Sequence, residues 1–186
     1  MKRLSALMAW AVLGAAPAFG QAPSAAPPPP APLAIPAPTY VSLVQEVAVN
    51  KPAAAVWARI GRYCDITEWL GPTCVLTAGV DGELGAVRTL NNGATIELLV
   101  AKTPLSYTYA QPVRVGVPYN AYHGTLEARA VTATTSKLVY SLFWDNSMLA
   151  DDAARQRDRE NRATRFMGAL TKMKAIAESG APRPAR

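Results

Sequence analysis

FMGALTKMKAIAE, residues 166–178, ends a long stretch of helical periodicity that decides the fold. From about Asp151 to Glu178, apolar residues recur three and four positions apart, which predicts one long amphipathic helix. The helix needs a partner surface to bury its apolar stripe, and that surface has to come from the residues before it. The predicted stripe consists of Ala163, Phe166, Met167, Leu170, Met173 and Ala177.

The residues before this helix are typical of strands, because apolar and polar side chains alternate along them. YVSLVQEVAV (40–49) is the first strand, and two short helical segments follow in NKPAAAVWARIGRY (50–63) and DITEWL (65–70). Gly71-Pro72 ends the second of these segments. Six further strands are predicted within TCVLTAGV, GAVRTL, TIELLVA, LSYTYAQ, YNAYHGTLEARAV and SKLVYSLFWD.

This order predicts an α+β fold in which about seven antiparallel strands curve around the long helix, since each surface buries the other. It resembles the helix-grip proteins, also called the START-like or Bet v 1-like superfamily, and in particular the bacterial polyketide cyclase/dehydrase or SRPBCC type. The likeness is carried by VWARIGRYCDITEWL, GAVRTL, IELL, SYTYA, YHGTLEA and FMGALTKMKAIAE, and it covers residues 41–178.

The resemblance implies a cavity between the sheet and the long helix. Most members of the superfamily bind apolar small molecules there, and a minority catalyse cyclisation or dehydration. We therefore expect a carrier or sensor for a small apolar or amphipathic ligand such as a lipid, with no metal and no organic cofactor. A cyclase or dehydratase, and an accessory protein that docks on a periplasmic dehydrogenase, are the alternatives.

Resemblance to the plant abscisic-acid receptors of the same superfamily implies that the glutamate of IELL points into the cavity. Side chains alternate between the two faces of a strand, so this glutamate fixes which residues of its strand face the cavity. On the later strands, the residues that match it in alternation are expected to face the cavity too. The predicted ligand-binding residues on these strands are Glu97, Leu99, Tyr122, Leu126, Tyr140, Leu142 and Trp144. The alternative is that the aromatic side chains only fill a core. Ile96, Leu98 and Val100 then form an apolar row on the convex face.

The hairpin signal Asn92-Gly93 predicts a two-residue type I′ turn, because both residues tolerate positive φ. That turn places Arg88 directly opposite Glu97, with both side chains on the same face of the sheet. If Glu97 faces the cavity, Arg88 does too, and the two form an ion pair on an apolar wall. Arg88 is therefore also a predicted ligand-binding residue.

The apolar stripe does not continue to the start of the long helix. Counting backward from Ala163 in helical steps reaches polar residues. The positions reached are Arg159 and Gln156, which either lie in solvent or edge the cavity mouth. Arg159 is included among the predicted ligand-binding residues. No catalytic residue is predicted, because His123 alternates with Tyr122 and so faces away from the cavity.

The first residues predict export. Lys2 and Arg3 precede a short apolar core, and small residues before Gln21 suit cleavage, which gives a signal peptide over 1–20. Retention of this segment as an anchor is the alternative. Residues 21–38 are almost entirely Ala and Pro and predict a semi-rigid linker.

We expect the folded domain over 39–180, a disordered tail over 181–186, and a periplasmic location. No later stretch is long and apolar enough to predict a membrane span. The net charge of +6 includes Lys2 and Arg3, and the other basic residues are scattered or interleaved with acids. This distribution predicts no nucleic-acid partner.

Two cysteines, Cys64 and Cys74, lie ten positions apart. In an oxidising periplasm such a pair is expected to form a disulfide, with free buried thiols as the alternative. A metal site needs further ligands, and the single histidine, His123, has no partner pattern. The pair therefore predicts a structural crosslink.

Overall fold

The computed structural model describes residues 37–183 and confirms the predicted order of elements. The predicted signal peptide and all but the last two residues of the linker lie outside the described residues. The elements are β1 (Tyr40–Val49), α1 (Ala53–Ile60), a 3-10 turn (Tyr63–Asp65), α2 (Ile66–Trp69), β2 (Cys74–Ala78), β3 (Val87–Leu90), β4 (Thr95–Thr103), β5 (Ser106–Ala110), β6 (Asn120–Ala130), β7 (Ser136–Asp145) and α3 (Asp152–Glu178).

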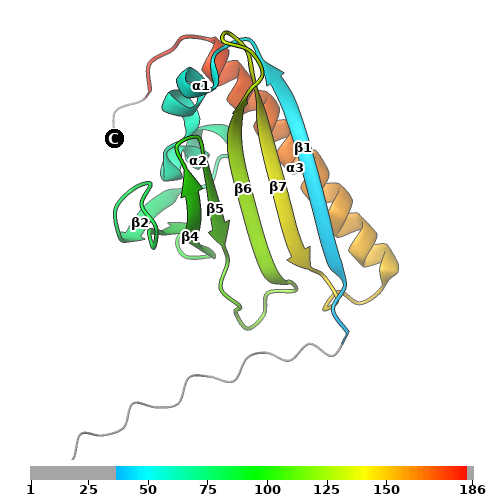
Figure 1. Ribbon diagram of the computed structural model, residues 1–186. Helices are drawn as coiled ribbons and strands as arrows, with labels where there is room; N and C mark the ends of the chain where they lie inside the picture. The colour runs from blue at the N-terminus through cyan, green and yellow to red at the C-terminus, as the bar shows by residue number, and fades with distance from the viewer. Residues whose placement is uncertain (1–36, 184–186) are drawn as a thin grey trace, which may run out of the picture. The chain divides into compact units, whose positions relative to one another are not determined.

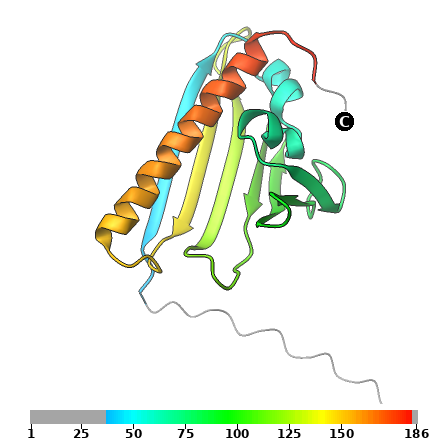
Figure 2. The same ribbon diagram turned by 180° about the vertical axis from the view of Figure 1, so that it is seen from behind.

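The seven strands form one antiparallel sheet in the order β1-β7-β6-β5-β4-β3-β2. The sheet curves around α3, which lies across its concave face, while α1 and α2 cover the end of the sheet where α3 finishes (Figures 1 and 2). Alternation along β4 buries Glu97 and Leu99 and leaves Leu98 and Val100 on the convex face, as predicted. The predicted α+β architecture is therefore confirmed.

The buried face of α3 begins at Phe166 and continues through Leu170, Met173 and Ala177. Met167, which the sequence places in this stripe, is instead 38% exposed. The reason is helical geometry: Met167 is one residue after Phe166 and so lies about 100° around the helix from it. Ala169 is buried in its place.

The β3–β4 hairpin has the predicted register. Asn92 and Gly93 both have positive φ, 56° and 90°, and the Ala94 amide donates to the Asn91 carbonyl at 3.2 Å. Arg88 consequently pairs with Glu97 across the two strands. The turn therefore fixes which side chains of β3 and β4 meet on the concave face.

A disulfide between Cys64 and Cys74 joins the 3-10 turn to the start of β2, which confirms the predicted pairing. The Tyr63 amide next to it donates to the Asp81 carboxylate at 3.0 Å. These links hold the segment that leads into α2 against the edge of the sheet. They matter for the site because α2 forms one of its walls.

The last described residues, 181–183, contact α1 and the 3-10 turn. Arg59 Nε donates to the Ala181 carbonyl at 3.1 Å, and Arg183 forms an ion pair with Asp65 at 3.2 Å. Within the described part of the chain, no helix is both long and apolar enough to cross a membrane.

Candidate functional site

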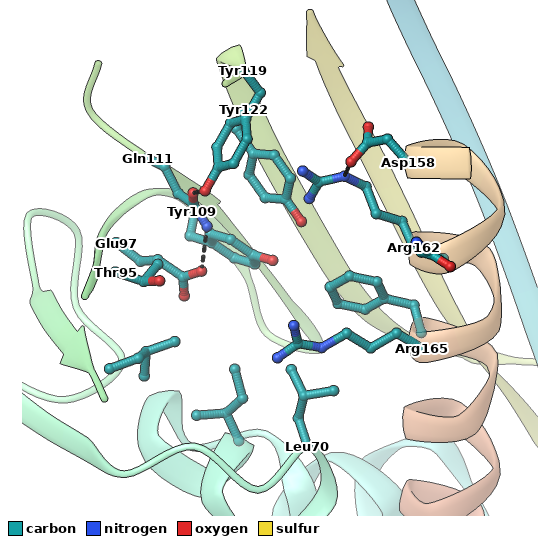
Figure 3. A pocket seen from close by; sticks show the side chains of 14 residues that line it. Leu70, Thr95, Glu97, Tyr109, Gln111, Tyr119, Tyr122, Asp158, Arg162 and Arg165 are labelled. Atoms are coloured by element: carbon teal, nitrogen blue, oxygen red, sulfur yellow. Dashed lines mark hydrogen bonds and ion pairs between the residues drawn. The ribbon is translucent and has the colours of Figure 1, made fainter. Parts of the chain in front are cut away.

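A cavity of about 320 Å³ lies between α2, the first half of α3 and the concave face of β3–β6. Figure 3 shows the side chains that surround it. Apolar and aromatic residues form most of one side, and charged or amide side chains gather on the sheet and on α3. The lining residues are Ile66, Leu70, Leu90, Thr95, Glu97, Tyr109, Gln111, Tyr119, Tyr122, Asp158, Asn161, Arg162, Arg165 and Phe166.

Glu97 is the acidic group of the sheet wall, and both of its carboxylate oxygens are bonded. Arg88 Nε donates to one oxygen at 2.7 Å, and the Gln111 side-chain amide donates to the other at 2.9 Å. The Tyr119 hydroxyl in turn donates to Gln111 at 2.7 Å. A chain of hydrogen bonds therefore runs from the buried Arg88 through Glu97 and Gln111 to Tyr119, and Figure 3 shows the part of it from Glu97 to Tyr119.

Arg88 is fully buried behind Glu97. Its guanidinium carbon lies 4.0 Å from the centre of the Tyr63 ring, and it donates to the Tyr63 carbonyl. Burial is the largest single effect and disfavours the charged guanidinium, but the adjacent Glu97 carboxylate and the neighbouring tyrosines together outweigh it and raise the pKa of Arg88. The arginine is thus a fixed positive charge that neutralises Glu97 from inside the wall.

Stacked and tilted tyrosine rings continue the wall along β5 and β6. The Tyr122 ring lies 6.2 Å from that of Tyr109 and 5.3 Å from that of Tyr119, centroid to centroid. Burial raises the pKa of Tyr122 to about 12, and burial also raises the pKa of Tyr109 and Tyr119. These phenols therefore stay protonated near neutral pH and act as hydrogen-bonding groups, not as bases.

On α3, Arg162 is held in place by an acid and by aromatic rings. Its Nε donates to Asp158 at 3.0 Å, and Asp158 also accepts from the Trp144 indole at 2.8 Å. The guanidinium carbon lies 4.8 Å from the centre of the Tyr119 ring and 5.0 Å from that of Tyr122. Arg162 thus closes the gap between the helix and the tyrosine wall.

Arg165 lies one turn further along α3 and differs from Arg162. It has no hydrogen-bond or ion-pair partner among residues 37–183, although it lines the same pocket. Figure 3 shows its side chain extending from α3 into the pocket, toward the side where Leu70 lies. An unpaired guanidinium therefore faces the cavity.

Solved structures with this arrangement cover most of the described domain. A protein from Nitrosospira multiformis is 23% identical, with 73% of this chain and 94% of that chain covered and a TM-score of 0.57. The ZhuI aromatase/cyclase from a Streptomyces species is 16% identical, with 75% and 94% covered and a TM-score of 0.59. No protein-family model and no curated protein sequence matches the chain.

A third solved structure is norcoclaurine synthase from Thalictrum flavum in complex with dopamine and hydroxybenzaldehyde. It is 10% identical, with 78% of this chain and 91% of that chain covered and a TM-score of 0.56. The chain has the Bet v 1-like, helix-grip fold. Bet v 1-like proteins typically bind hydrophobic ligands, and the pocket found here lies between the sheet and the long helix of this fold.

Two of the residues predicted to face the helix-grip cavity, Glu97 and Tyr122, line the pocket. The others lie on the predicted concave face but are packed into the core next to the pocket. The Tyr140 hydroxyl, for example, is hydrogen-bonded to that of Tyr109 at 3.0 Å, and the Tyr140 ring is tilted against that of Phe166 with 4.6 Å between centroids. The predicted residues that are buried outside the lining are Arg88, Leu99, Leu126, Tyr140, Leu142 and Trp144.

The placement of Arg159 at the cavity mouth is wrong: this residue is exposed and does not line the pocket. Counting backward from Ala163 follows a line about 60° around the helix from Phe166. Counting four and eight residues back from Phe166 instead gives Arg162 and Asp158, which do line the pocket. Helical spacing therefore identifies Arg162 and Asp158 when the count starts from Phe166 and not from Ala163.

Sequence reasoning also missed Tyr109, Gln111, Tyr119 and Arg165. Tyr109 lies two residues after Tyr107, so strand alternation puts both on the same face of the sheet, and the reasoning used for the other strands could have selected Tyr109. Gln111 and Tyr119 flank the connection between β5 and β6, where no periodicity applies. Nothing in the sequence distinguishes Arg165 from the other arginines of α3.

Groups suited to proton transfer do not gather beside a nucleophile in this pocket. His123 is exposed, with Nδ1 2.8 Å from the Ala121 carbonyl, and Asp145 accepts from the Thr39 amide at 2.8 Å outside the pocket. Among residues 37–183, no group of three or more His, Cys, Asp and Glu side chains is placed to hold a metal ion.

Proposed function

We propose that this protein is an exported, periplasmic binding protein for a small amphipathic molecule. The observation that supports it best is the pocket itself, which joins an aromatic and aliphatic wall to a few fixed polar groups. Such walls provide apolar burial, while a small number of oriented polar groups selects the ligand. The ligand occupies the space between α2, α3 and β3–β6.

The size of the pocket limits the ligand. A volume of about 320 Å³ is at the lower end of the range for small-molecule sites, about 300–1,000 Å³. A molecule of one to three rings or a short acyl chain fits this space. A two-chain lipid does not fit unless α3 moves away from the sheet.

Binding, as opposed to turnover, is supported by the state of the polar groups. Both oxygens of Glu97 are already bonded, and the tyrosines of the wall are protonated near neutral pH. Two of the solved structures with this fold are enzymes, but a shared fold does not transfer an activity. The polar groups here are arranged to orient a ligand.

The binding proposal predicts saturable uptake of phenylnaphthylamine, a neutral dye that joins a phenyl ring to a naphthalene and whose fluorescence rises in apolar surroundings. Asn161→Trp is expected to weaken this uptake by about ten-fold or more, because the indole fills space that a close-packed site cannot recover. Asn161 is exposed on α3 and lines the pocket, so the change leaves the core intact.

Arg159→Trp is the matched control for this experiment, because it adds the same side chain at an exposed position of α3 that does not line the pocket. It is expected to leave dye affinity unchanged. Equal affinity in wild type and Asn161→Trp would show that the dye binds elsewhere, and absence of saturable uptake in wild type would refute the binding role.

Export is supported by the N-terminal sequence and by the disulfide, since disulfides persist in oxidising compartments. Intact-mass analysis of protein from a periplasmic extract of its host should find a chain that begins near Gln21 with the Cys64–Cys74 bond closed. A chain that still carries Met1, or two thiols that react with an alkylating reagent, contradicts export with cleavage. The same spectra recorded under native conditions identify any retained ligand.

A further inference from the structure

We propose that the ligand is an anion: a ring-bearing or short-chain molecule with a carboxylate or sulfonate group that binds Arg165. This inference rests on the proposed binding function and adds the charge of the ligand to it. Three features of the site support this inference: the charges around the pocket, the partners that each charge already has, and the position of Arg165.

The charges that line or directly back the pocket do not balance. Three arginines, Arg88, Arg162 and Arg165, face two carboxylates, Glu97 and Asp158. Two of the arginines are paired one-to-one with the carboxylates. One positive charge is left over within the site, and the bound molecule is the group that can neutralise it.

The leftover charge resides on Arg165, because the other two arginines are fully engaged. Arg88 is buried and holds Glu97, while Arg162 is paired with Asp158 and covered by three aromatic rings. Releasing either one would leave a carboxylate inside the wall without its cation, which is unfavourable. Arg165 needs no such rearrangement.

Arg165 is also in the right place for an amphipathic anion. It is exposed, so it lies where the pocket meets solvent, and Phe166 beside it reaches the interior. Asn161 precedes it by one helical turn, lines the same pocket and adds an amide donor. An acid group at this rim receives charge-assisted hydrogen bonds while the apolar part of the ligand lies against Phe166 and Tyr122.

The nearby Glu97 carboxylate does not oppose this arrangement. Its charge is neutralised by Arg88, and its two oxygens already accept hydrogen bonds from Arg88 and Gln111. The sheet side of the pocket is therefore close to neutral as seen by a ligand. The helix side determines the sign of the charge that is favoured.

Two dyes with the same aromatic body test the inference: anilinonaphthalene sulfonate, which is anionic, and phenylnaphthylamine, which lacks the sulfonate. Wild-type protein is expected to bind the anion about ten-fold more tightly than the neutral dye, as for a charge-assisted hydrogen bond. Arg165→Gln is expected to abolish this preference, because it weakens binding of the anion about ten-fold relative to binding of the neutral dye.

Arg159→Gln is the control, because it removes the same charge from an exposed position of α3 that does not line the pocket. It should leave both affinities unchanged. A preference for the anion that survives Arg165→Gln, or that falls equally in Arg159→Gln, overturns the assignment. Equal binding of both dyes by wild type also overturns it but leaves the binding function intact. Loss of saturable binding of both dyes contradicts the binding function itself.

Discussion

Replacing Glu97 with alanine is expected to lower the free energy of unfolding by about 3–5 kcal/mol, because it leaves the charge of Arg88 buried and unpaired. Arg88 is 0% exposed and has Glu97 as its only acidic partner among residues 37–183. Against a total of about 5–15 kcal/mol for a typical domain, this loss is large. It is also asymmetric: Arg88→Ala should cost less, because a buried carboxyl can gain a proton whereas a guanidinium cannot lose one.

The double change Glu97→Ala with Arg88→Ala should be more stable than the Glu97 single variant. Removing both groups eliminates the unpaired charge and leaves mainly a packing loss against Tyr63 and Tyr109. Chemical denaturation of wild type, the two singles and the double gives the coupling energy directly. Additive effects would mean that the two side chains do not interact.

The exposed pair Glu83 and Lys102 is the matched control for this cycle. Its atoms approach to 2.9 Å, almost as close as those of Arg88 and Glu97, but both side chains are well exposed. Solvent screening makes such pairs weak, so its cycle should be additive. The contrast isolates burial as the cause of the coupling.

The Arg88–Glu97 pair also shows what was predictable from the sequence. The turn chemistry of Asn92-Gly93 fixes the register of one hairpin, and the register alone places the two charges together. The order of strands and helices was predictable for the same reason, because apolar periodicity is a local property of the chain. The disulfide pairing followed from having only two cysteines.

The site was less predictable, because a cavity is the difference between the volumes of many side chains and the space between the elements. Tyr140 lies on the expected face, yet Tyr109 and Phe166 pack against it. Trp144 lies on that face too, but Tyr122 and Arg162, which line the pocket, pack against it. Alternation predicts on which face of the sheet a side chain lies, but it does not predict how far that side chain is from the cavity. The residues of α3 were missed because the choice of anchor shifted the helical phase.

Gly124 on β6 explains why Tyr109 can reach the pocket. The two residues pair directly across β5 and β6, and the Tyr109 ring lies over the glycine. A Cβ atom at position 124 would lie 2.6 Å from Cε1 of the ring, closer than van der Waals contact allows. The ring cannot move aside easily, because it is buried and bonded to the Tyr140 hydroxyl at 3.0 Å.

Gly124→Ala is therefore expected to lower the free energy of unfolding by about 2–3 kcal/mol, the cost of overpacking a filled core. Conformational entropy alone predicts the opposite sign, since glycine in a strand is less favourable than alanine by about 0.5–1 kcal/mol. The variant should also bind phenylnaphthylamine less tightly, because any displaced ring enters the pocket.

Gly168→Ala is the matched control, since this glycine lies on α3 and an added Cβ meets no atom within 4 Å. The same chemical change should there raise the free energy of unfolding by up to about 1 kcal/mol, through helix propensity. Opposite signs for the two substitutions would show that contact with Tyr109, and not glycine as such, decides the outcome at position 124. A stabilising Gly124→Ala would mean that the ring has room to move, and the wall of the pocket would then be softer than its hydrogen bonds indicate.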